Sequence, residues 1–482
     1  MTLLSLKFFL FLAISVFAYY LSPLHVRVYV LSVLSMLFYL LLGIVSFICI
    51  LAVASISFCL ALWIERRGRE GTGGLLFISV LLVLIIWLGV RGAVGLSLIA
   101  LPIGISFYSL RVISYLADVK RGSVAAEKNF LKYILYTSFF PIAFLGPVTN
   151  YKDVNSTLLY PNRASWDNIC GGILRILFGV FKKLVVADAL IEPVRLIISD
   201  TDSFFGAYVV ILIVIYSAEI YFDFSGGIDI AIGASCIFGV SMPENFNKPF
   251  SSKTIAEFWN RWHITLGEWV EHYVFYPISL SRPMQRVSRY LRKKLGINVG
   301  KRIPLYFSTL LAWLITGLWH GGKGHFVAWG LINGILVILS SETSKIINGL
   351  CGRHRAIDSF RRKVSFLSSA RVFIVIGAVR LLDVYEDTSL TFKMIGSIFT
   401  RPESYIGIVD AIINLIPPSS LIPIFLGLAT VFFVSKLGIR AQKICRHPYA
   451  FALCVVTLIS TSLLFGRYGY GFDASDFIYS QF

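Results

Sequence analysis

Residues 47–64 read Phe47-Ile-Cys-Ile-Leu-Ala-Val-Ala-Ser-Ile-Ser-Phe-Cys-Leu-Ala-Leu-Trp-Ile64 and contain no charged side chain. A helix needs about 20 residues of this kind to cross the hydrocarbon core of a bilayer. A second run, Leu75–Leu88, is also apolar almost without interruption. Neither run shows the alternation of apolar and polar residues that is typical of membrane β-strands. The two runs therefore predict a helical membrane protein.

The composition of the whole chain agrees with these runs. Of its 482 residues, 57% are apolar and 15% are charged, and its mean hydropathy of +0.77 is far above that of a soluble domain. At about 20 residues per crossing, eleven helices use roughly half of the chain and leave no stretch for a separate soluble domain. We therefore predict one all-α, polytopic membrane domain over residues 1–482, with re-entrant or interfacial helices beside about eleven transmembrane helices.

The charge of the chain is strongly basic. The 44 Lys and Arg residues exceed the 26 Asp and Glu residues by 18. In a soluble protein this excess would suggest a nucleic-acid partner, but in membrane proteins basic residues collect in cytoplasmic loops. We predict no nucleic-acid partner and assign five basic clusters to the cytoplasm: residues 65–70, 120–121, 282–302, 353–363 and 436–446.

The seven cysteines are scattered along the chain and form no Cys-x-x-Cys pair. Zinc sites and disulfide frameworks of small proteins have closer and more regular spacings. We predict no metal site and interpret the cysteines as small core residues.

The stretch from Lys128 to Leu280 contains about five apolar segments between two cytoplasmic clusters. An odd number of crossings cannot return the chain to the same side, so at least one segment must be re-entrant or interfacial. Irregular backbone at membrane depth is tolerated only where it is buried in protein or lines a wet cavity. We therefore expect a site in this stretch.

One candidate residue of this stretch is His263. The segment Glu257–His272 is predicted to form an amphipathic helix, with Arg261 on its polar stripe and His263 about 200° away on the apolar face. A buried imidazole needs a hydrogen-bond partner. His263 is therefore either a core histidine that fixes the helix or a functional group.

A second candidate is His320, in Gly317-Leu-Trp-His-Gly-Gly322. This motif ends the apolar run Ile303–Trp319 and precedes a new run that starts near Phe326. Flanking glycines permit close backbone approach, and a neutral imidazole with a pKa of about 6.5 can accept a proton from an alcohol near pH 7. His320 is therefore either a catalytic base or a histidine in a turn at a helix end.

These motifs and several others resemble the membrane-bound O-acyltransferase family, in the bacterial branch that contains alginate and peptidoglycan O-acetylases and the teichoic acid D-alanyltransferase. The tail Gly471–Phe482 is similar to the ending of the polysaccharide O-acetylases. The resemblance runs nearly end to end, and the similar segments follow in family order: Pro102–Tyr108, Ile113–Asp118, Gly146-Pro147, Phe181–Asp188, Tyr221–Gly226, Pro243–Phe250, Phe258–His263 and Gly317–Gly321.

The resemblance implies that His320 is the catalytic histidine and His263 a second functional histidine, both facing a central tunnel with His320 at its narrow point. Acyl transfer needs a base for the hydroxyl and a donor for the oxyanion. We assign the first role to His320 and the second to His263 or Asn260. In this chain Gly322-Lys-Gly-His325 follows the motif, so His325 competes for the role of base.

Further residues are expected to line or support the tunnel, namely Trp259, Trp319 and Asp223. Asp223 and Asp229 could also suggest an ion pathway. Because Ser225-Gly226-Gly227 lies between them, we prefer a structural role for both at a helix break.

The C-terminal tail contains Phe477, Tyr479 and Phe482. In related acyltransferases a tyrosine in such a motif is thought to receive the acyl group and pass it to a secreted partner. Tyr479 is therefore a candidate acyl relay, although Ser480 stands where an aromatic residue is more usual. The alternative is that the aromatic tail anchors at the membrane interface.

The basic stretch 281–302 holds eight Lys and Arg residues and no acid. One interpretation is contact with anionic lipid. The other is a docking surface for an anionic acyl donor, such as the diphosphate of coenzyme A or an acidic acyl carrier protein. Four residues are the candidates for docking: Arg289, Arg292, Lys293 and Lys294.

Together these observations predict a multi-pass acyltransferase of the bacterial cytoplasmic (inner) membrane that supports O-acetylation of a cell-surface or secreted polysaccharide. We expect no bound cofactor, acetyl-CoA or an acyl carrier protein as donor, and a secreted or membrane-anchored SGNH-type transferase as partner. Two alternatives remain: D-alanyl transfer to teichoic acid and, from another class, transport or flipping of a polyprenyl-linked glycan. The absence of detectable inverted repeats disfavours the transporter.

Overall fold

The computed structural model describes residues 2–68, scattered positions between 74 and 89, and residues 102–353, 365–406, 408–415, 421–425, 427–430 and 444–468. In these residues all regular secondary structure is helical, and the extended segments form a single isolated bridge between Phe246 and Trp262. The predicted all-α class is confirmed.

Within the described residues, seven helices are long and apolar enough to cross a membrane. They confirm a polytopic membrane protein. The count of about eleven stays a prediction, because most of Leu75–Leu88 lies outside the described residues. The seven candidate spans are Leu24–Leu42, which contains α2 (Arg27–Leu42), α3 (Ile44–Arg66), α10 (Ala207–Ile237), α15 (Ile297–His320), most of α16 (Gly324–Arg353), α18 (Ser365–Val384) and α23 (Pro448–Phe465).

The chain divides into two compact units that alternate along the sequence, and the expectation of one domain stays a prediction. The first unit comprises Met1–Val185, Asp223–Pro243 and Val431–Phe482, and the second comprises Val186–Phe222 and Glu244–Thr430. Helix α10 contributes residues to both units.

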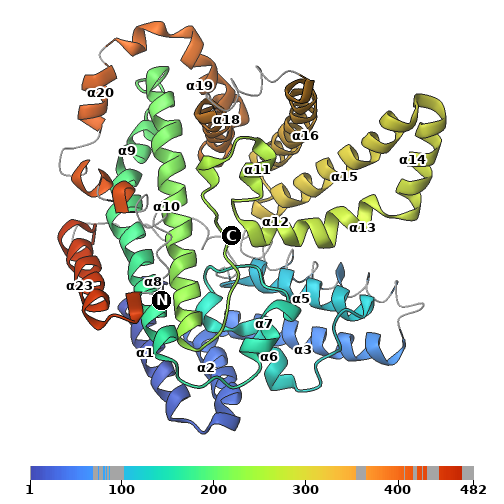
Figure 1. Ribbon diagram of the computed structural model, residues 1–482, viewed down its shortest axis with the longest axis vertical. Coiled ribbons are helices and arrows are strands. Elements are labelled where there is room, and N and C mark those ends of the chain that lie inside the picture. The colour runs from blue at the N-terminus through green and yellow to red at the C-terminus, as the bar shows by residue number, and fades with distance from the viewer. Residues whose placement is uncertain are drawn as a thin grey trace. The chain divides into compact units, whose positions relative to one another are not determined.

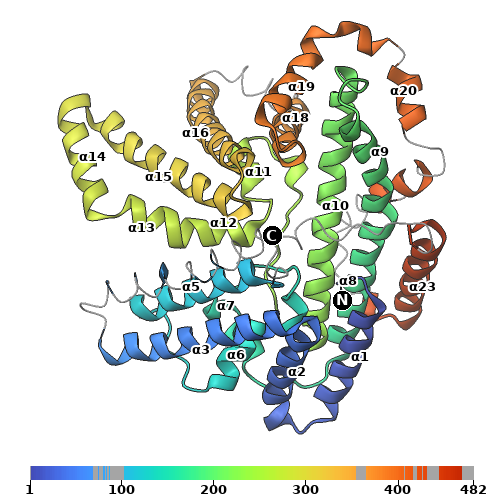
Figure 2. The same cartoon turned by 180° about the vertical axis from the view of Figure 1, so that it is seen from behind.

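In the first unit, α3 and α6 (Phe130–Ser138) pack against α5 (Ile105–Arg121), which is buried from Ile105 to Val119 (Figures 1 and 2). Helix α2 packs against α3 and α6. Helix α23 packs against α8 in the same unit. The other helices of this unit are α1 (Leu6–Leu21), α5 (Ile105–Arg121), α6 (Phe130–Ser138), α7 (Tyr151–Leu158) and α8 (Trp166–Phe181).

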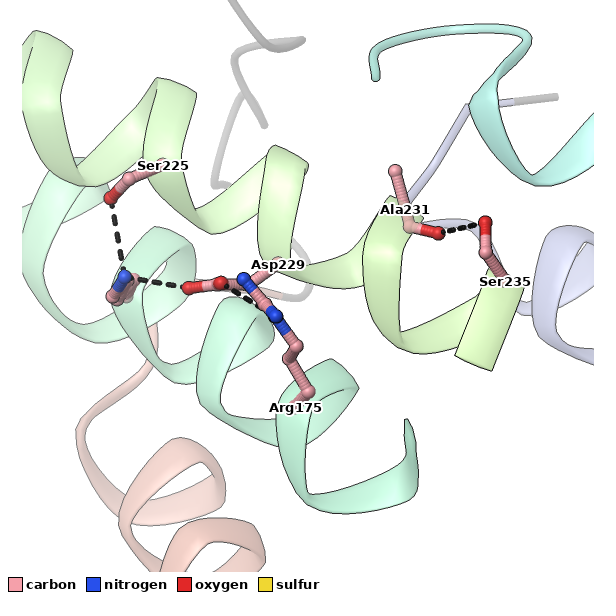
Figure 3. Close-up of polar contacts among 6 residues, drawn as sticks. Arg175, Ser225, Asp229, Ala231 and Ser235 are labelled. Atoms are coloured by element: carbon pink, nitrogen blue, oxygen red, sulfur yellow. Dashed lines mark hydrogen bonds and ion pairs between the residues drawn. The ribbon is translucent and has the colours of Figure 1, made fainter. Parts of the chain in front are cut away.

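Buried ion pairs join α8 and the π-helical turn Lys182–Ala187 to α10 in the first unit. Lys183 Nζ lies 2.7 Å from Asp223 Oδ1. Asp229 accepts from Lys182 Nζ at 2.6 Å and from Arg175 Nε at 3.0 Å, and the Lys182 amine also contacts Ser225 (Figure 3). Asp223 and Asp229 thus connect α10 to α8 and to the π-helical turn that follows α8.

The predicted helix break between these aspartates is wrong, because α10 continues through Ser225, Gly226 and Gly227. A helix keeps its backbone groups paired, which is required where water is absent. Gly226 instead allows α8 to approach α10 closely, since a Cβ at position 226 would lie 2.8 Å from the carbonyl oxygen of Gly179 on α8. The glycines therefore permit close helix packing.

In the second unit the chain runs along α12 (Ile264–Val270) and α13 (Tyr276–Ser279), turns at α14 (Arg282–Leu295) and returns along α15 (Figure 1). Helix α15 packs against α16, and Gly317 faces Gly330 at this contact. The remaining helices of this unit are α9 (Asp188–Ser199), α11 (Ile255–Trp259), α12 (Ile264–Val270), α13 (Tyr276–Ser279), α14 (Arg282–Leu295), α19 (Thr388–Thr400) and α20 (Ile408–Leu415).

We expect Gly330→Val to destabilise the protein, because a Cβ at position 330 would lie 2.5 Å from the carbonyl oxygen of Trp313. Overpacking of this kind costs about 1–3 kcal/mol. Thermal unfolding of the detergent-solubilised protein, followed by tryptophan fluorescence, measures the effect. The control is Gly349→Ala on the same helix, where a Cβ meets no atom within 4 Å. Equal midpoints for the two variants would contradict the close packing.

Three irregular places in the backbone between Lys128 and Leu280 are relevant to the site, and the re-entrant or interfacial segment expected there stays a prediction. Two are the π-helical turns Lys182–Ala187 and Glu271–Phe275, and the third is the interruption between α11 and α12. π-Helical turns are often found at functional sites. The interruption contains one of the two candidate histidines.

Candidate active site

His263 lies at a sharp break in the backbone. The predicted continuous helix over Glu257–His272 is wrong, because α11 ends at Trp259 and α12 begins at Ile264. His263 adopts left-handed backbone angles, with φ 49° and ψ 49°. This conformation is uncommon for residues other than glycine and persists only where the surroundings enforce it.

A neighbouring extended segment enforces the break. The backbone N–H of Ile264 donates to Asn245 O at 3.0 Å, and that of Asn247 donates to Arg261 O at 2.9 Å. These bonds replace helical ones on both sides of His263. Tertiary hydrogen bonding therefore overrides the helical pattern of the sequence.

The side chain of Asn245 fixes the His263 imidazole. Its Oδ1 accepts from the backbone N–H and the hydroxyl of Thr265, at 3.1 and 2.9 Å, and lies 3.3 Å from His263 Nδ1. A carboxamide oxygen only accepts hydrogen bonds, so we assign the proton of neutral His263 to Nδ1. The Nε2 atom then carries a lone pair.

His263 is buried and neutral near pH 7. Burial, together with the charge that His320 can carry, lowers the pKa of its imidazole from 6.5 to about 3. As the Nδ1–H tautomer, Nε2 can accept a proton or a hydrogen bond but cannot donate one. The tautomer therefore disfavours His263 as the donor to an oxyanion.

His320 is the last residue of α15, as the sequence predicts, and α16 begins after a short turn at Gly324. Its imidazole is buried among aromatic rings. The ring centroids of Trp319 and Trp329 both lie 5.0 Å from that of His320, and Phe326 stacks on it at 6.4 Å. Apolar rings on several sides restrict the access of water to this imidazole.

Tryptophan rings connect the two histidines. The His263 and Trp319 ring centroids are 6.5 Å apart, and Trp319 adjoins His320. The ring centroid of Trp329, which also adjoins His320, lies 5.7 Å from that of Trp259 and 5.9 Å from that of Trp313. We call these six residues the histidine–tryptophan cluster: Trp259, His263, Trp313, Trp319, His320 and Trp329.

The other predicted residues of the second unit differ in their surroundings. Asn260 is exposed at the end of α11, so of the two predicted oxyanion donors only His263 is buried. His325 is buried beside Phe326, with ring centroids 4.2 Å apart. Its Nδ1 has no hydrogen-bond partner among the described residues. The Nδ1 atom of His325 could therefore accept a proton, and His325 stays a candidate base beside His320.

The remaining predicted residues belong to other parts of the chain. Asp223 is in the first unit, paired with Lys183. The four docking candidates lie on α14, where they are exposed, and Tyr479 lies outside the described residues. No group of three or more His, Cys, Asp and Glu side chains in the described ranges is arranged to hold a metal ion.

Sequence reasoning did not single out Asn245, Trp313 or Trp329. Asn245 precedes His263 by 18 residues and lies in a loop without periodicity. Trp313 and Trp329 fall within apolar helical runs, where a tryptophan is most simply a core residue. Of the three residues, only Asn245 lies in a segment that resembles a family motif, Pro243–Phe250.

A buried arginine stabilises the residue that precedes His263. The Arg380 guanidinium lies 3.8 Å from the ring centroid of Trp262, which stacks on Phe258 with centroids 5.7 Å apart. A desolvated cation–π contact of this kind contributes about 2 kcal/mol. Arg380 therefore stabilises the backbone next to the left-handed histidine.

We expect Arg380→Met to lower the free energy of unfolding by about 2 kcal/mol, because the cation–π contact is lost. Arg380→Lys should fall between this variant and the wild type, because an ammonium does not stack as a planar guanidinium does. The measurement is the thermal unfolding midpoint, with Arg371→Met as the control, since Arg371 is exposed on the same helix. A midpoint of Arg380→Met equal to that of the control would contradict the contact.

The model of the membrane-bound O-acyltransferase family matches residues 28–360, which include both histidines. A probable alginate O-acetylase, AlgI, of Azotobacter vinelandii is 36% identical over 242 residues, covering 49% of this chain and 44% of the relative.

Two further relatives differ in the group or polymer that their names give. The peptidoglycan O-acetyltransferase of Helicobacter pylori is 33% identical over 268 residues, covering 49% of this chain and 46% of the relative. The teichoic acid D-alanyltransferase of Bacillus subtilis is 27% identical over 244 residues, covering 49% of this chain and 58% of the relative. The chain spans about half the length of the curated relatives it matches. Because the family model covers more than half of the sequence, this chain belongs to the membrane-bound O-acyltransferase family.

Proposed function

We propose that this protein is an acyltransferase that moves an acetyl group from a cytoplasmic donor across the inner membrane for O-acetylation of a cell-surface or secreted polysaccharide. The observation that carries the proposal is the histidine–tryptophan cluster, which holds two buried imidazoles. That of His320 is at the end of the candidate membrane span α15, and that of His263 is at the break between α11 and α12. The names of the O-acetylase relatives support the choice of an acetyl group and a polysaccharide.

The reaction requires few groups. The acceptor hydroxyl attacks the thioester carbonyl while His320 takes its proton, and the tetrahedral intermediate then expels the thiolate, which recovers the proton from the imidazolium. A water-poor site strengthens electrostatic stabilisation of this intermediate and limits hydrolysis. The aromatic surroundings of His320 suit that requirement.

The donor side is proposed to involve α14. Its four docking candidates Arg289, Arg292, Lys293 and Lys294 are exposed, and none of them forms an ion pair with another described residue. Exposed cations of this kind can bind the diphosphate of acetyl-CoA, an acidic acyl carrier protein or anionic lipid. We propose acetyl-CoA or an acyl carrier protein as donor and anionic lipid as a further contact of this helix.

The acceptor side is proposed to involve a secreted or membrane-anchored SGNH-type transferase that delivers the acetyl group to the polymer. Tyr479 remains a candidate relay between the two proteins. The proposal predicts that Tyr479 carries an acetyl ester during turnover, which mass spectrometry of the C-terminal peptide can detect.

The ester content of surface glycans tests the proposed function. Glycans from a strain that lacks the protein and from its complemented counterpart are treated with mild base, and the released acids are identified by mass spectrometry. Acetate that depends on the protein supports the proposal, whereas D-alanine would favour the runner-up, D-alanyl transfer to teichoic acid. Unchanged esters would refute both acyl-transfer functions and favour glycan transport.

A further inference from the structure

The orientation of the Asn245 carboxamide is determined by its neighbours. The backbone N–H of Thr265, which can only donate, lies 3.1 Å from Asn245 Oδ1. The oxygen must therefore face Thr265 and His263, and Nδ2 is the other branch of the carboxamide.

The Nδ2 group of Asn245 has no acceptor in the part of the chain that the structure describes. The residue is 0% exposed, and within the described ranges Nδ2 makes no hydrogen bond. A buried N–H group without a partner is destabilising, because it has lost its hydrogen bonds to water. An unsatisfied buried donor of this kind in a native protein calls for an explanation, and a ligand that accepts its hydrogen bond is one.

Two donors of the histidine–tryptophan cluster share this property. The indole N–H groups of Trp259 and Trp329 are buried and have no acceptor among the described residues. Trp329 contacts both Trp259 and His320 through its ring. The surroundings of the two histidines are therefore rich in donors, and they suit a ligand that brings oxygen lone pairs.

We infer that Asn245 is a further catalytic residue, whose Nδ2–H donates a hydrogen bond to the acyl carbonyl oxygen of the donor. The inference rests on the proposed function. As the hydroxyl oxygen bonds to the carbonyl carbon, the π electron pair moves to the carbonyl oxygen, and the hydrogen bond to this oxyanion strengthens. Collapse of the intermediate returns the pair and breaks the carbon–sulfur bond.

This assignment replaces His263 in the role of oxyanion donor. The same Asn245 side chain holds His263 through Oδ1, so one residue orients the imidazole and presents a donor. The Nε2 lone pair of His263 remains suited to accept a proton or a hydrogen bond during the reaction.

The variant that separates the two functions of Asn245 is Asn245→Asp. The carboxylate keeps an oxygen for Thr265 and for His263 Nδ1, but it has no N–H group. With full-length protein in nanodiscs and acetyl-CoA as the probe, thiol release measures turnover. We expect kcat to fall by about 100-fold or more, with the KM for acetyl-CoA within about threefold of wild type.

The matched control is Thr265→Val, which removes one donor to Asn245 Oδ1 and leaves the Nδ2 group in place. We expect its kcat to stay within about tenfold of wild type, because a hydrogen bond of this kind contributes about 1 kcal/mol. The thermal unfolding midpoint of each variant shows whether it is folded.

A measurement on the wild type does not depend on the folding of a variant. The infrared carbonyl band of ¹³C-labelled acetyl-CoA should move to lower frequency on binding, because the carbonyl accepts a hydrogen bond. A folded Asn245→Asp variant with unchanged kcat, or a bound carbonyl band at its free position, would overturn the inference alone. Absence of any acetyl transfer by the wild type would instead refute the proposed function, and the inference with it.

Discussion

Replacing His320 by alanine is expected to lower kcat by about 10²–10⁴-fold, because general-base catalysis contributes a factor of this size. The imidazole ends α15 inside a ring of aromatic side chains, where no other described residue of the histidine–tryptophan cluster except His263 can accept a proton. The measurement is thiol release from acetyl-CoA by the full-length protein in nanodiscs.

Two other histidines provide the controls for this prediction. His272 is exposed, and its Nδ1 lies 2.8 Å from Glu268 O, so His272→Ala should retain the wild-type rate. His325→Ala tests the competing base, which follows His320 by five residues. Loss of turnover in His325→Ala but not in His320→Ala would transfer the role of base to His325.

Replacing Lys183 by methionine is expected to destabilise the protein by about 3–5 kcal/mol, because it leaves the carboxylate of Asp223 buried without this cation. Lys183 and Asp223 have side chains 1% and 0% exposed, and their charged atoms are 2.7 Å apart. The measurement is the thermal unfolding midpoint of the detergent-solubilised protein, with the amount of protein in the membrane as a second readout.

An exposed lysine provides the control for this ion pair. Lys345 pairs with Glu342 on the surface of α16 and is 57% exposed, so Lys345→Met should change stability by less than about 1 kcal/mol. The double variant Lys183→Met, Asp223→Leu should recover much of the loss, because an apolar pair replaces the buried charges. Equal midpoints for Lys183→Met and Lys345→Met would contradict a stabilising role of the buried pair.

Much of the fold could be predicted because it depends on local composition. Uncharged runs such as Phe47–Ile64 form membrane-length helices, and the end of α15 at His320 coincides with the glycines of the motif. In both cases the deciding feature lies within the segment itself. Hydrophobic length and glycine placement are visible in one sequence.

The break at His263 could not be predicted in this way. The apolar spacing of residues 257–272 fits a helix, but hydrogen bonds from the distant Asn245 and Asn247 segment interrupt it. The same limit applies to Gly226, where an expected break is a site of close helix packing. Propensity yields to tertiary contacts at such positions.

The sequence points to the two histidines of the candidate site but not to the residues that support them. His263 and His320 were identified by motif and resemblance, whereas Asn245, Trp313 and Trp329 became visible only through their contacts. A residue that acts through one long-range hydrogen bond leaves no periodic signal. Asn245 is the clearest case, because its position in a loop gives no pattern.

The most direct test of the account is the acetate content of surface polysaccharide in a strain that lacks this protein and expresses wild type, His320→Ala or His272→Ala at equal levels. The account predicts base-labile acetate with wild type and with His272→Ala, and none with His320→Ala. Equal acetate with His320→Ala and wild type, or acetate that does not depend on the protein at all, would contradict it.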